Sequence, residues 1–256
     1  MITHFPPIDG SSGVAVGDKP FYLAVAQGAV EGYSNVSKFG YNDAIGSGSY
    51  ESIWETGGAY PFMTTADQLE IVSADSNDTS AGSGARTVEL QGLDSSYNLL
   101  TETITMNGTA TVTTTGSFLR IFRVRVITAG TSETNEGNIT ITDQDTSTTR
   151  ATISAGNGQT LMAVYTVPAG KTAYIVKINV SSGKDQEITF RLRTNDRTIT
   201  NSSWQIKEFI DTRGGFTPWD KLAINKVTQK TDIDLQAIGQ STTAAAGGYE
   251  LILVDN

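Results

Sequence analysis

The spacing of short apolar runs constrains the fold more than any other feature of this sequence. Runs rich in Val, Ile, Thr, Tyr and Phe recur every ~8–12 residues, and clusters of Gly, Asn, Asp and Ser separate them. Many of these runs alternate, as from Leu99 to Met106, and a period of two residues is that of a half-buried β-strand. No ten-residue window has the period of an amphipathic helix. The sequence therefore predicts an all-β protein.

Composition agrees with this prediction and bounds the size of the core. Thr accounts for roughly one residue in seven, whereas the helix formers Lys and Glu are sparse. The chain has 256 residues, of which 38% are hydrophobic, which is enough for one large β core or two smaller ones. We expect a β-sandwich or jelly-roll type of fold. In its clearest strand we expect one face to carry Phe118, Arg120, Phe122, Val124 and Val126.

A polar segment from Thr128 to Gly137 interrupts the strand pattern and predicts a boundary between two β domains. Residues 1–20 are then an extended N-terminal arm, because they are rich in proline and glycine. Residues 21–130 form an N-terminal β domain whose aromatic-rich lead-in begins with a strand-like run, Phe21 to Ala26. Residues 131–256 form a C-terminal, jelly-roll-like β-sandwich domain.

Turn residues predict how some of these strands are connected. Asn107-Gly108 lies between two alternating runs and is a strong hairpin signal. Gly156-Asn157-Gly158 lacks the further glycine and the helix of a dinucleotide-binding loop, and is interpreted as a second hairpin turn. Ser181-Ser182-Gly183 is expected to separate a strand over 172–180 from one over 188–193.

Charge and hydropathy disfavour two kinds of partner. The net charge is −9, about −7 of it over residues 1–130, and a surface that binds the phosphates of a nucleic acid needs the opposite sign. No run approaches the ~20 apolar residues of a membrane-spanning helix. The start of the sequence has neither the basic nor the apolar region of a secretory signal. We therefore expect no nucleic-acid partner, no membrane partner and no secretion.

The residues that usually carry catalysis are scarce. There is no cysteine, and the sole histidine is His4, within the expected arm. Gly170-Lys171-Thr172 resembles the end of a phosphate-binding loop, but Tyr165 stands where that loop requires glycine and a strand is expected to follow. No nucleophile elbow of the Gly-x-Ser-x-Gly type occurs. We expect no enzymatic activity, no catalytic residues and no cofactor.

Two acidic runs have the residue types of a calcium loop but not its spacing. The first contains Asp75, Asn77 and Asp78, and the second Asp143 and Asp145. In both runs the sixth position is not the glycine of the EF-hand, and the twelfth is not its glutamate. We interpret them as turn carboxylates and expect no metal site.

Six arginines form two clusters on predicted strands, and we expect their side chains to form salt bridges. The clusters are Arg120, Arg123 and Arg125, and Arg191, Arg193 and Arg197. Because the net charge opposes nucleic-acid binding, we expect these guanidinium groups to form salt bridges with the acidic N-terminal half or with another subunit.

Several stretches from Phe21 onward resemble a family of structural proteins of tailed phages, notably marine podoviruses. In the first half these are Val36-Ser37-Lys38-Phe39-Gly40, Ile53-Trp54, Ala85-Arg86-Thr87-Val88, Gly92-Leu93-Asp94, Glu102-Thr103, Asn107-Gly108-Thr109 and Phe118-Leu119-Arg120. In the second half they are Gly156-Asn157-Gly158-Gln159-Thr160-Leu161-Met162, Tyr165-Thr166-Val167-Pro168-Ala169-Gly170, Lys230-Thr231-Asp232-Ile233 and 248–254, Gly-Tyr-Glu-Leu-Ile-Leu-Val.

The resemblance implies a virion protein, assembled in the host cytoplasm, with a structural role such as capsid decoration (cement) or minor capsid protein. Its partners are then the major capsid protein or other virion proteins, together with sister copies in a homo-oligomer, for which a trimer suits a capsid lattice. The arm residues expected to contact a partner are Phe5, Pro6, Pro7 and Ile8.

Two other functions remain open at this stage. One is a tail, neck or fibre protein that binds host-surface carbohydrate through stacking on Trp54, Trp204 or Trp219. The other is a carbohydrate-active enzyme that uses a pair of carboxylates, for which only the general abundance of Asp and Glu speaks.

Overall fold

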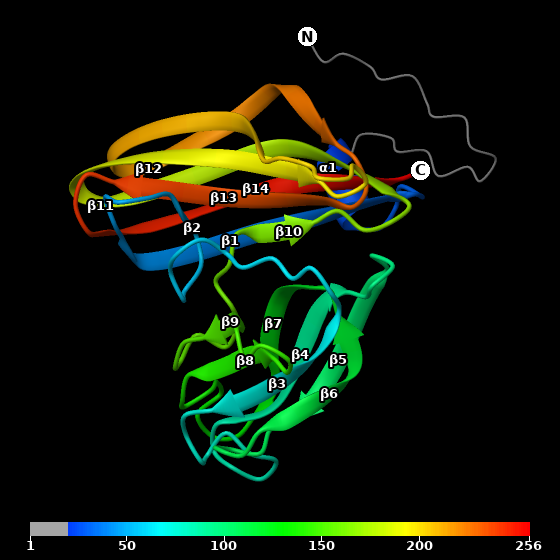
Figure 1. Ribbon diagram of the computed structural model, residues 1–256, viewed down its shortest axis with the longest axis vertical. Coiled ribbons are helices and arrows are strands. Elements are labelled where there is room, and N and C mark those ends of the chain that lie inside the picture. The colour runs from blue at the N-terminus through cyan, green and yellow to red at the C-terminus, as the bar shows by residue number, and fades with distance from the viewer. Residues whose placement is uncertain (1–19) are drawn as a thin grey trace.

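The computed structural model describes residues 20–256, except for the side chains of residues 184–185, 216 and 219–224. The described chain forms two β-sandwiches, which lie one above the other in Figure 1. The predicted all-β sandwich fold is confirmed. The predicted arm, with Phe5, Pro6, Pro7 and Ile8, lies outside the described residues, apart from Pro20.

The large sandwich is one antiparallel sheet with the strand order β1-β14-β11-β13-β10, to which β12 adds on β11 and β2 adds on β13. Its strands are β1 (Tyr33–Ile45), β2 (Glu51–Ser52), β10 (Val164–Thr166), β11 (Lys171–Asp196), β12 (Gln205–Val227), β13 (Thr231–Gly239) and β14 (Thr243–Asp255). β1 pairs with β14 from Tyr33 opposite Val254 to Ile45 opposite Thr243, so the sheet joins segments far apart in sequence.

The long strands β11 and β12 make this sheet curl into a sandwich that nearly closes on itself (Figure 1). β11 pairs with β14 over residues 171–182 and with β13 over residues 188–196, and β12 accompanies it on the other side. The expected strand break at Ser181-Ser182-Gly183 is wrong. Ser181 and Ser182 pair on both sides, and only a shift of register between Ser182 and Glu187 marks the turn signal.

The small sandwich is inserted between β2 and β10. One sheet has the order β6-β3-β8-β9, formed by β3 (Asp67–Ser73), β6 (Val112–Phe118), β8 (Ile139–Asp143) and β9 (Thr149–Ile153). The other has the order β5-β4-β7, formed by β4 (Ala85–Leu93), β5 (Leu99–Thr105) and β7 (Arg120–Ala129). Its core includes Leu69, Val88, Phe118 and Ile141. The polar segment that follows Thr128 connects β7 to β8 within this sandwich.

The run predicted as the first strand is instead the short helix α1 (Phe21–Ala26). Ala24 donates a backbone hydrogen bond to Pro20 and Gln27 donates one to Leu23, and Gly28 follows with a φ of +69°. A continuous apolar run of six residues does not distinguish a buried strand from a helix by periodicity, which explains the error.

Neither predicted hairpin forms, although both glycine-containing segments are turns. β5 pairs with β4 and β6 with β3, so the strands on either side of Asn107-Gly108 enter different sheets. Glu102 of β5 bridges them instead, because its carboxylate accepts hydrogen bonds from the backbone of Thr115 and Gly116, at 2.8 and 2.9 Å. The strands on either side of residues 156–158 also enter different sheets, because β9 pairs with β8 and β10 pairs with β13.

The chain passes from one sheet of the small sandwich to the other at Leu119, between β6 and β7. The five residues from 118 to 122 are therefore all buried, and the predicted alternation of faces holds only beyond Phe122. Gly92 of β4 allows this crossing, because a Cβ atom there would lie 2.0 Å from the carbonyl oxygen of Arg120.

Candidate functional site

The two sandwiches meet at a junction where charged side chains are buried, and the centre of this junction is the pair Arg120–Asp232. Arg120 lies at the start of β7 and Asp232 in β13. Nε and Nη2 of the guanidinium donate to the two carboxylate oxygens at 2.8 and 3.0 Å. Nη1 donates to the carbonyl oxygens of Met63 and Leu119, at 2.6 and 2.8 Å. The side chain of Arg120 is 4% exposed and that of Asp232 is fully buried.

Asp232 also binds groups of the large sandwich itself. Its Oδ2 accepts a hydrogen bond from Nε of Arg197 at 2.6 Å, and its Oδ1 accepts one from the hydroxyl of Thr166 at 2.6 Å. A buried carboxylate is stable when its oxygens are satisfied in this way. Asp232 thus holds the small sandwich, through Arg120, to a site that the large sandwich has already organised.

Asp232 begins a polar face of β13 that continues with Asp234 and Gln236, because alternate residues of a strand share a face. The register places Arg193 of β11 opposite Asp234 and Arg191 opposite Gln236. Arg193 donates twice to Oδ2 of Asp234, at 3.0 and 2.8 Å, and Arg191 donates twice to Oε1 of Gln236, at 2.9 and 2.7 Å. We call these five residues the polar ladder.

Aromatic rings cover the two arginines of the polar ladder. The guanidinium carbon of Arg191 lies 3.8 Å from the ring centre of Tyr50, and that of Arg193 lies 4.0 Å from the ring centre of Trp204. Such stacking favours the cation while shielding it from water. Tyr60 adds a further link between the sandwiches. Its backbone nitrogen donates to the Ser52 hydroxyl of β2 at 2.9 Å, and its own hydroxyl donates to the carbonyl oxygen of Ile121 of β7 at 3.1 Å.

Asp234 is the member of the polar ladder with the most perturbed ionisation. Complete burial raises the pKa of its carboxyl to about 6, against the opposing effect of the Arg193 guanidinium. Its Oδ1 forms no hydrogen bond within the described part of the chain. A perturbed pKa often marks a catalytic acid or base, but Asp232 and Asp234 are both fully buried, which keeps their oxygens from a bulky substrate. The side chains of the polar ladder join β11 to β13, and Asp232 extends the ladder to the small sandwich through Arg120.

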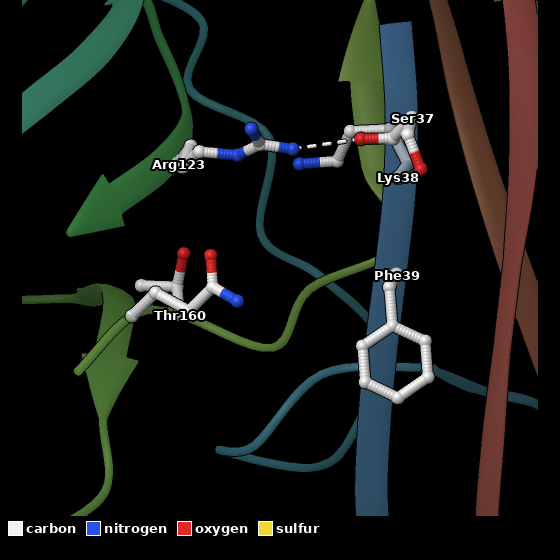
Figure 2. Close-up of a pocket in the computed structure, with 6 residues that line it drawn as sticks. Ser37, Lys38, Phe39, Arg123 and Thr160 are labelled. Carbon is white, nitrogen blue, oxygen red and sulfur yellow. Dashed lines mark hydrogen bonds between the residues drawn. The ribbon is translucent and has the colours of Figure 1, made fainter. Parts of the chain in front are cut away.

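A cavity opens beside the junction, between β1 of the large sandwich and β7 of the small one (Figure 2). Its volume is about 270 Å³, and it is lined by Ser37, Lys38, Phe39, Arg123, Gln159 and Thr160. Figure 2 shows the side chains of Lys38 and Arg123 extending toward one another from the two strands. We call this space the β1–β7 cavity.

Lys38 is 4% exposed and donates a hydrogen bond to the carbonyl oxygen of Phe122. Burial lowers the pKa of Lys38 well below its usual value, and the charge of Arg123 lowers it further. Arg123 in turn donates to the carbonyl oxygen of Ser37 at 2.7 Å. The cavity therefore brings two basic side chains together in a protein whose net charge is negative.

Three arginines of the predicted clusters, Arg120, Arg193 and Arg197, are brought together around Asp232 and Asp234, but their partners differ from those expected. Arg125 does pair with the acidic N-terminal half, through Glu89 at 2.9 Å. The expectation is wrong for Arg120, Arg193 and Arg197, whose partners Asp232 and Asp234 belong to the C-terminal half. The alternation of polar and apolar residues over β13 places Asp232 and Asp234 on one face. The same alternation is typical of a strand with one face in solvent, so it did not predict that these carboxylates are buried partners of the arginines.

The sequence pattern around Lys38 does not predict that this side chain is buried. It shares a face of β1 with Gly40 and Asn42, and a face of that composition is expected in solvent. The face is buried because the connections of the small sandwich lie against it. A Cβ atom on Gly40 would be 2.2 Å from the carbonyl oxygen of Ile53 and 2.6 Å from the nitrogen of Ala163.

The acidic runs considered for calcium are used to hold loops. Asp78 is fully buried, and its carboxylate accepts hydrogen bonds from the hydroxyl of Ser73 and the backbone of Ala85, Glu136 and Gly137, at 2.5 to 2.9 Å. Asp143 accepts from Arg150 at 3.1 Å. Among the side chains that the structure describes, no three carboxylates or histidines converge as metal ligands would.

The tryptophans considered for sugar stacking are placed differently from one another. Trp54 is buried, and its indole nitrogen donates to the carbonyl oxygen of Gly58 at 3.1 Å. Trp204 is half-buried against Arg193 and Phe62. The side chain of Trp219 lies outside the described residues. Among the described helices, none has the length and hydropathy to cross a membrane.

Comparison with known proteins adds little to this geometry. No family model matches the chain, and no curated protein matches it. Among solved structures, one chain from the structure of infectious bursal disease virus, Gt strain, is similar at 10% sequence identity and a TM-score of 0.15, over 87% of this chain and 71% of that chain. A likeness at that TM-score carries no argument about this protein.

Proposed function

We propose that this protein is a structural component of a tailed-phage virion, a capsid decoration or minor capsid protein that binds the shell and sister copies. Its location is then the virion, after assembly in the host cytoplasm, and its partners are the major capsid protein or other virion proteins. The resemblance of its sequence to phage structural proteins motivates the proposal, and one surface feature carries it.

That feature is an exposed aromatic surface on β1, an edge strand of the large sheet. Tyr33, Phe39 and Tyr41 lie on the same side of β1 by the alternation of the strand, opposite the buried Lys38 and Gly40. Phe39 is 48% exposed and Tyr41 37% exposed. We call Tyr33, Phe39 and Tyr41, with Phe21 and Tyr22 of α1, the β1 aromatic face.

The helix α1 extends this surface at the start of the strand. The ring of Phe21 meets that of Tyr33 edge-on, with centres 5.7 Å apart, and Tyr22 beside it is 54% exposed. Exposed aromatic side chains are typical of the centres of protein–protein interfaces. In an acidic protein such a surface indicates a protein partner, which a virion supplies in many ordered copies.

Electron cryo-microscopy of the purified virion tests the proposal directly. We expect density for this chain on the capsid lattice, with the β1 aromatic face against the shell or against a sister copy, in trimers. Density confined to the portal or the tail would contradict the capsid assignment. It would favour instead a tail, neck or fibre protein, for which binding of host-surface carbohydrate is the next property to measure.

A further inference from the structure

The lining of the β1–β7 cavity has two basic side chains and no acidic one. The six lining residues include Lys38 and Arg123 but no aspartate or glutamate. A buried ammonium group is costly unless an anion or several hydrogen-bond acceptors accompany it. The described residues give Lys38 no salt bridge, and its hydrogen bond is to a neutral carbonyl oxygen, that of Phe122.

Three other polar side chains of the cavity have N–H or O–H groups that are available to a ligand. Arg123 has five N–H groups, of which one is used in the hydrogen bond to Ser37. The Thr160 hydroxyl oxygen accepts a hydrogen bond from the backbone of Val124 at 3.1 Å, which leaves its own proton for another acceptor. Gln159 contributes an amide that has two donors. Positively charged and neutral donors thus surround one space.

We propose that the β1–β7 cavity binds a small oxyanion, a phosphate or a small carboxylate, between Lys38 and Arg123. A guanidinium fork and an ammonium group are the usual ligands of such anions, and each forms charge-assisted hydrogen bonds with them. A volume of about 270 Å³ limits the ligand to a small molecule or ion. This inference does not depend on the virion assignment.

Ionisation of Lys38 supports the inference. Burial and the charge of Arg123 both lower the pKa of Lys38, and a bound anion opposes both effects by favouring the ammonium form. The charged and titratable groups around the cavity are Arg123 and Arg125 of β7, Glu89 of β4, which pairs with Arg125, Tyr165 of β10, and Glu250 of β14, which accepts a hydrogen bond from Ser37. Binding should therefore tighten as the pH falls through the pKa of Lys38.

Titration calorimetry of the full chain at low ionic strength, first with inorganic phosphate and then with acetate, tests the proposal. We expect saturable binding of at least one of them, and the stronger of the two defines the class of ligand. Lys38→Met keeps the side-chain volume but removes the charge, and should weaken binding by at least ~10-fold. Lys207→Met changes an exposed lysine of β12 and should leave the affinity unchanged.

A second readout follows Lys38 itself. With ¹³C-labelled lysine, phosphate should raise the pKa of Lys38 in nuclear magnetic resonance spectra, whereas chloride at the same ionic strength should not. If Lys38→Met does not fold, the half-buried Arg123→Met replaces it in the same comparison, with the same loss expected. Absence of saturable binding by the unmodified protein, or equal affinities for it and the folded variant, overturns the proposal.

Discussion

Single residues of β7 are expected to differ widely in how much they contribute to stability, because their burial differs. Arg120 and Asp232 are almost completely enclosed, whereas Arg125, in its pair with Glu89, is 47% exposed. Breaking a buried pair leaves an uncompensated charge away from water, but an exposed pair is largely replaced by solvent. The two arginines lie on the same strand, which makes them a matched test.

Arg120→Met should lower the free energy of unfolding by ~3 kcal/mol, because Asp232 keeps Arg197 and Thr166 but loses its bidentate partner. Arg125→Met should change it by no more than ~1 kcal/mol. Denaturation by urea at neutral pH, followed by tryptophan fluorescence, measures both. Equal losses in the two variants would mean that the junction does not depend on this pair.

Asp234 predicts a dependence of stability on pH that runs against the usual direction for a carboxylate. Its pKa is about 6 in the folded protein and 3.8 for an ordinary aspartate, so between these values the folded protein holds a proton that the unfolded chain has released. Stability contributed by this group therefore falls by ~3 kcal/mol as the pH rises from about 4 to about 6.

Asp234→Asn isolates this effect from carboxylates such as Asp143, whose hydrogen bonds and ion pair lower its pKa and act oppositely. The free energy of unfolding of the unmodified protein, relative to that of the variant, should decrease from pH 4 to pH 7. The measurement is urea denaturation of both proteins at each pH. A difference that stays constant over this range would show that Asp234 titrates normally.

At the scale of elements, the sequence predicted the strands far better than their pairing. Strand runs such as β3, β8 and β13 follow from local alternation and β-branched residues, which are properties of neighbouring positions. Pairing depends on distant partners, so Asn107-Gly108 predicted a hairpin where the chain instead crosses between sheets. The junction between the sandwiches could not be predicted from the sequence for the same reason, because Arg120 and Asp232 are distant in sequence and meet only in the folded protein.

The crossing at Leu119 depends on the close approach of β4 to the backbone of β7. Gly92→Ala would place a methyl group 2.0 Å from the carbonyl oxygen of Arg120 and 2.7 Å from the ring of Phe118, so one strand must move. We expect a loss of ~1–3 kcal/mol in the free energy of unfolding. Gly48→Ala, where a Cβ meets no atom within 4 Å, is the control in the same denaturation experiment. An unchanged Gly92→Ala would show that β4 is free to shift.

The β1 aromatic face makes a prediction about assembly rather than folding. Phe39→Ser combined with Tyr41→Ser should leave the thermal midpoint nearly unchanged, since exposed substitutions usually alter stability by only ~0.5 kcal/mol. The occupancy of the protein on virions should fall strongly, as measured by quantitative mass spectrometry of purified particles. Ile206→Ser, on exposed β12, should keep full occupancy. If only the Ile206→Ser variant lost occupancy on virions, the β1 aromatic face would not be the interface.

As a whole molecule, the protein has two hydrophobic cores that share one polar junction. Because Arg120 and Tyr60 connect the sandwiches through buried groups, we expect them to unfold together. Scanning calorimetry should show a single transition whose calorimetric and van't Hoff enthalpies agree. Arg120→Met should separate it into two transitions or broaden it. Two transitions in the unmodified protein would contradict the coupling.

The insertion of the small sandwich also determines the order in which the two sandwiches can fold during translation. Strands β3 to β9 are complete once residue 153 has emerged from the ribosome, and their pairings are all with one another. β1 must wait for β14, so Tyr33 finds Val254 only after the intervening chain has been made. Since non-local pairing is slow and unpaired edges aggregate, the early-folding insert shortens the loop that β1 and β14 have to close.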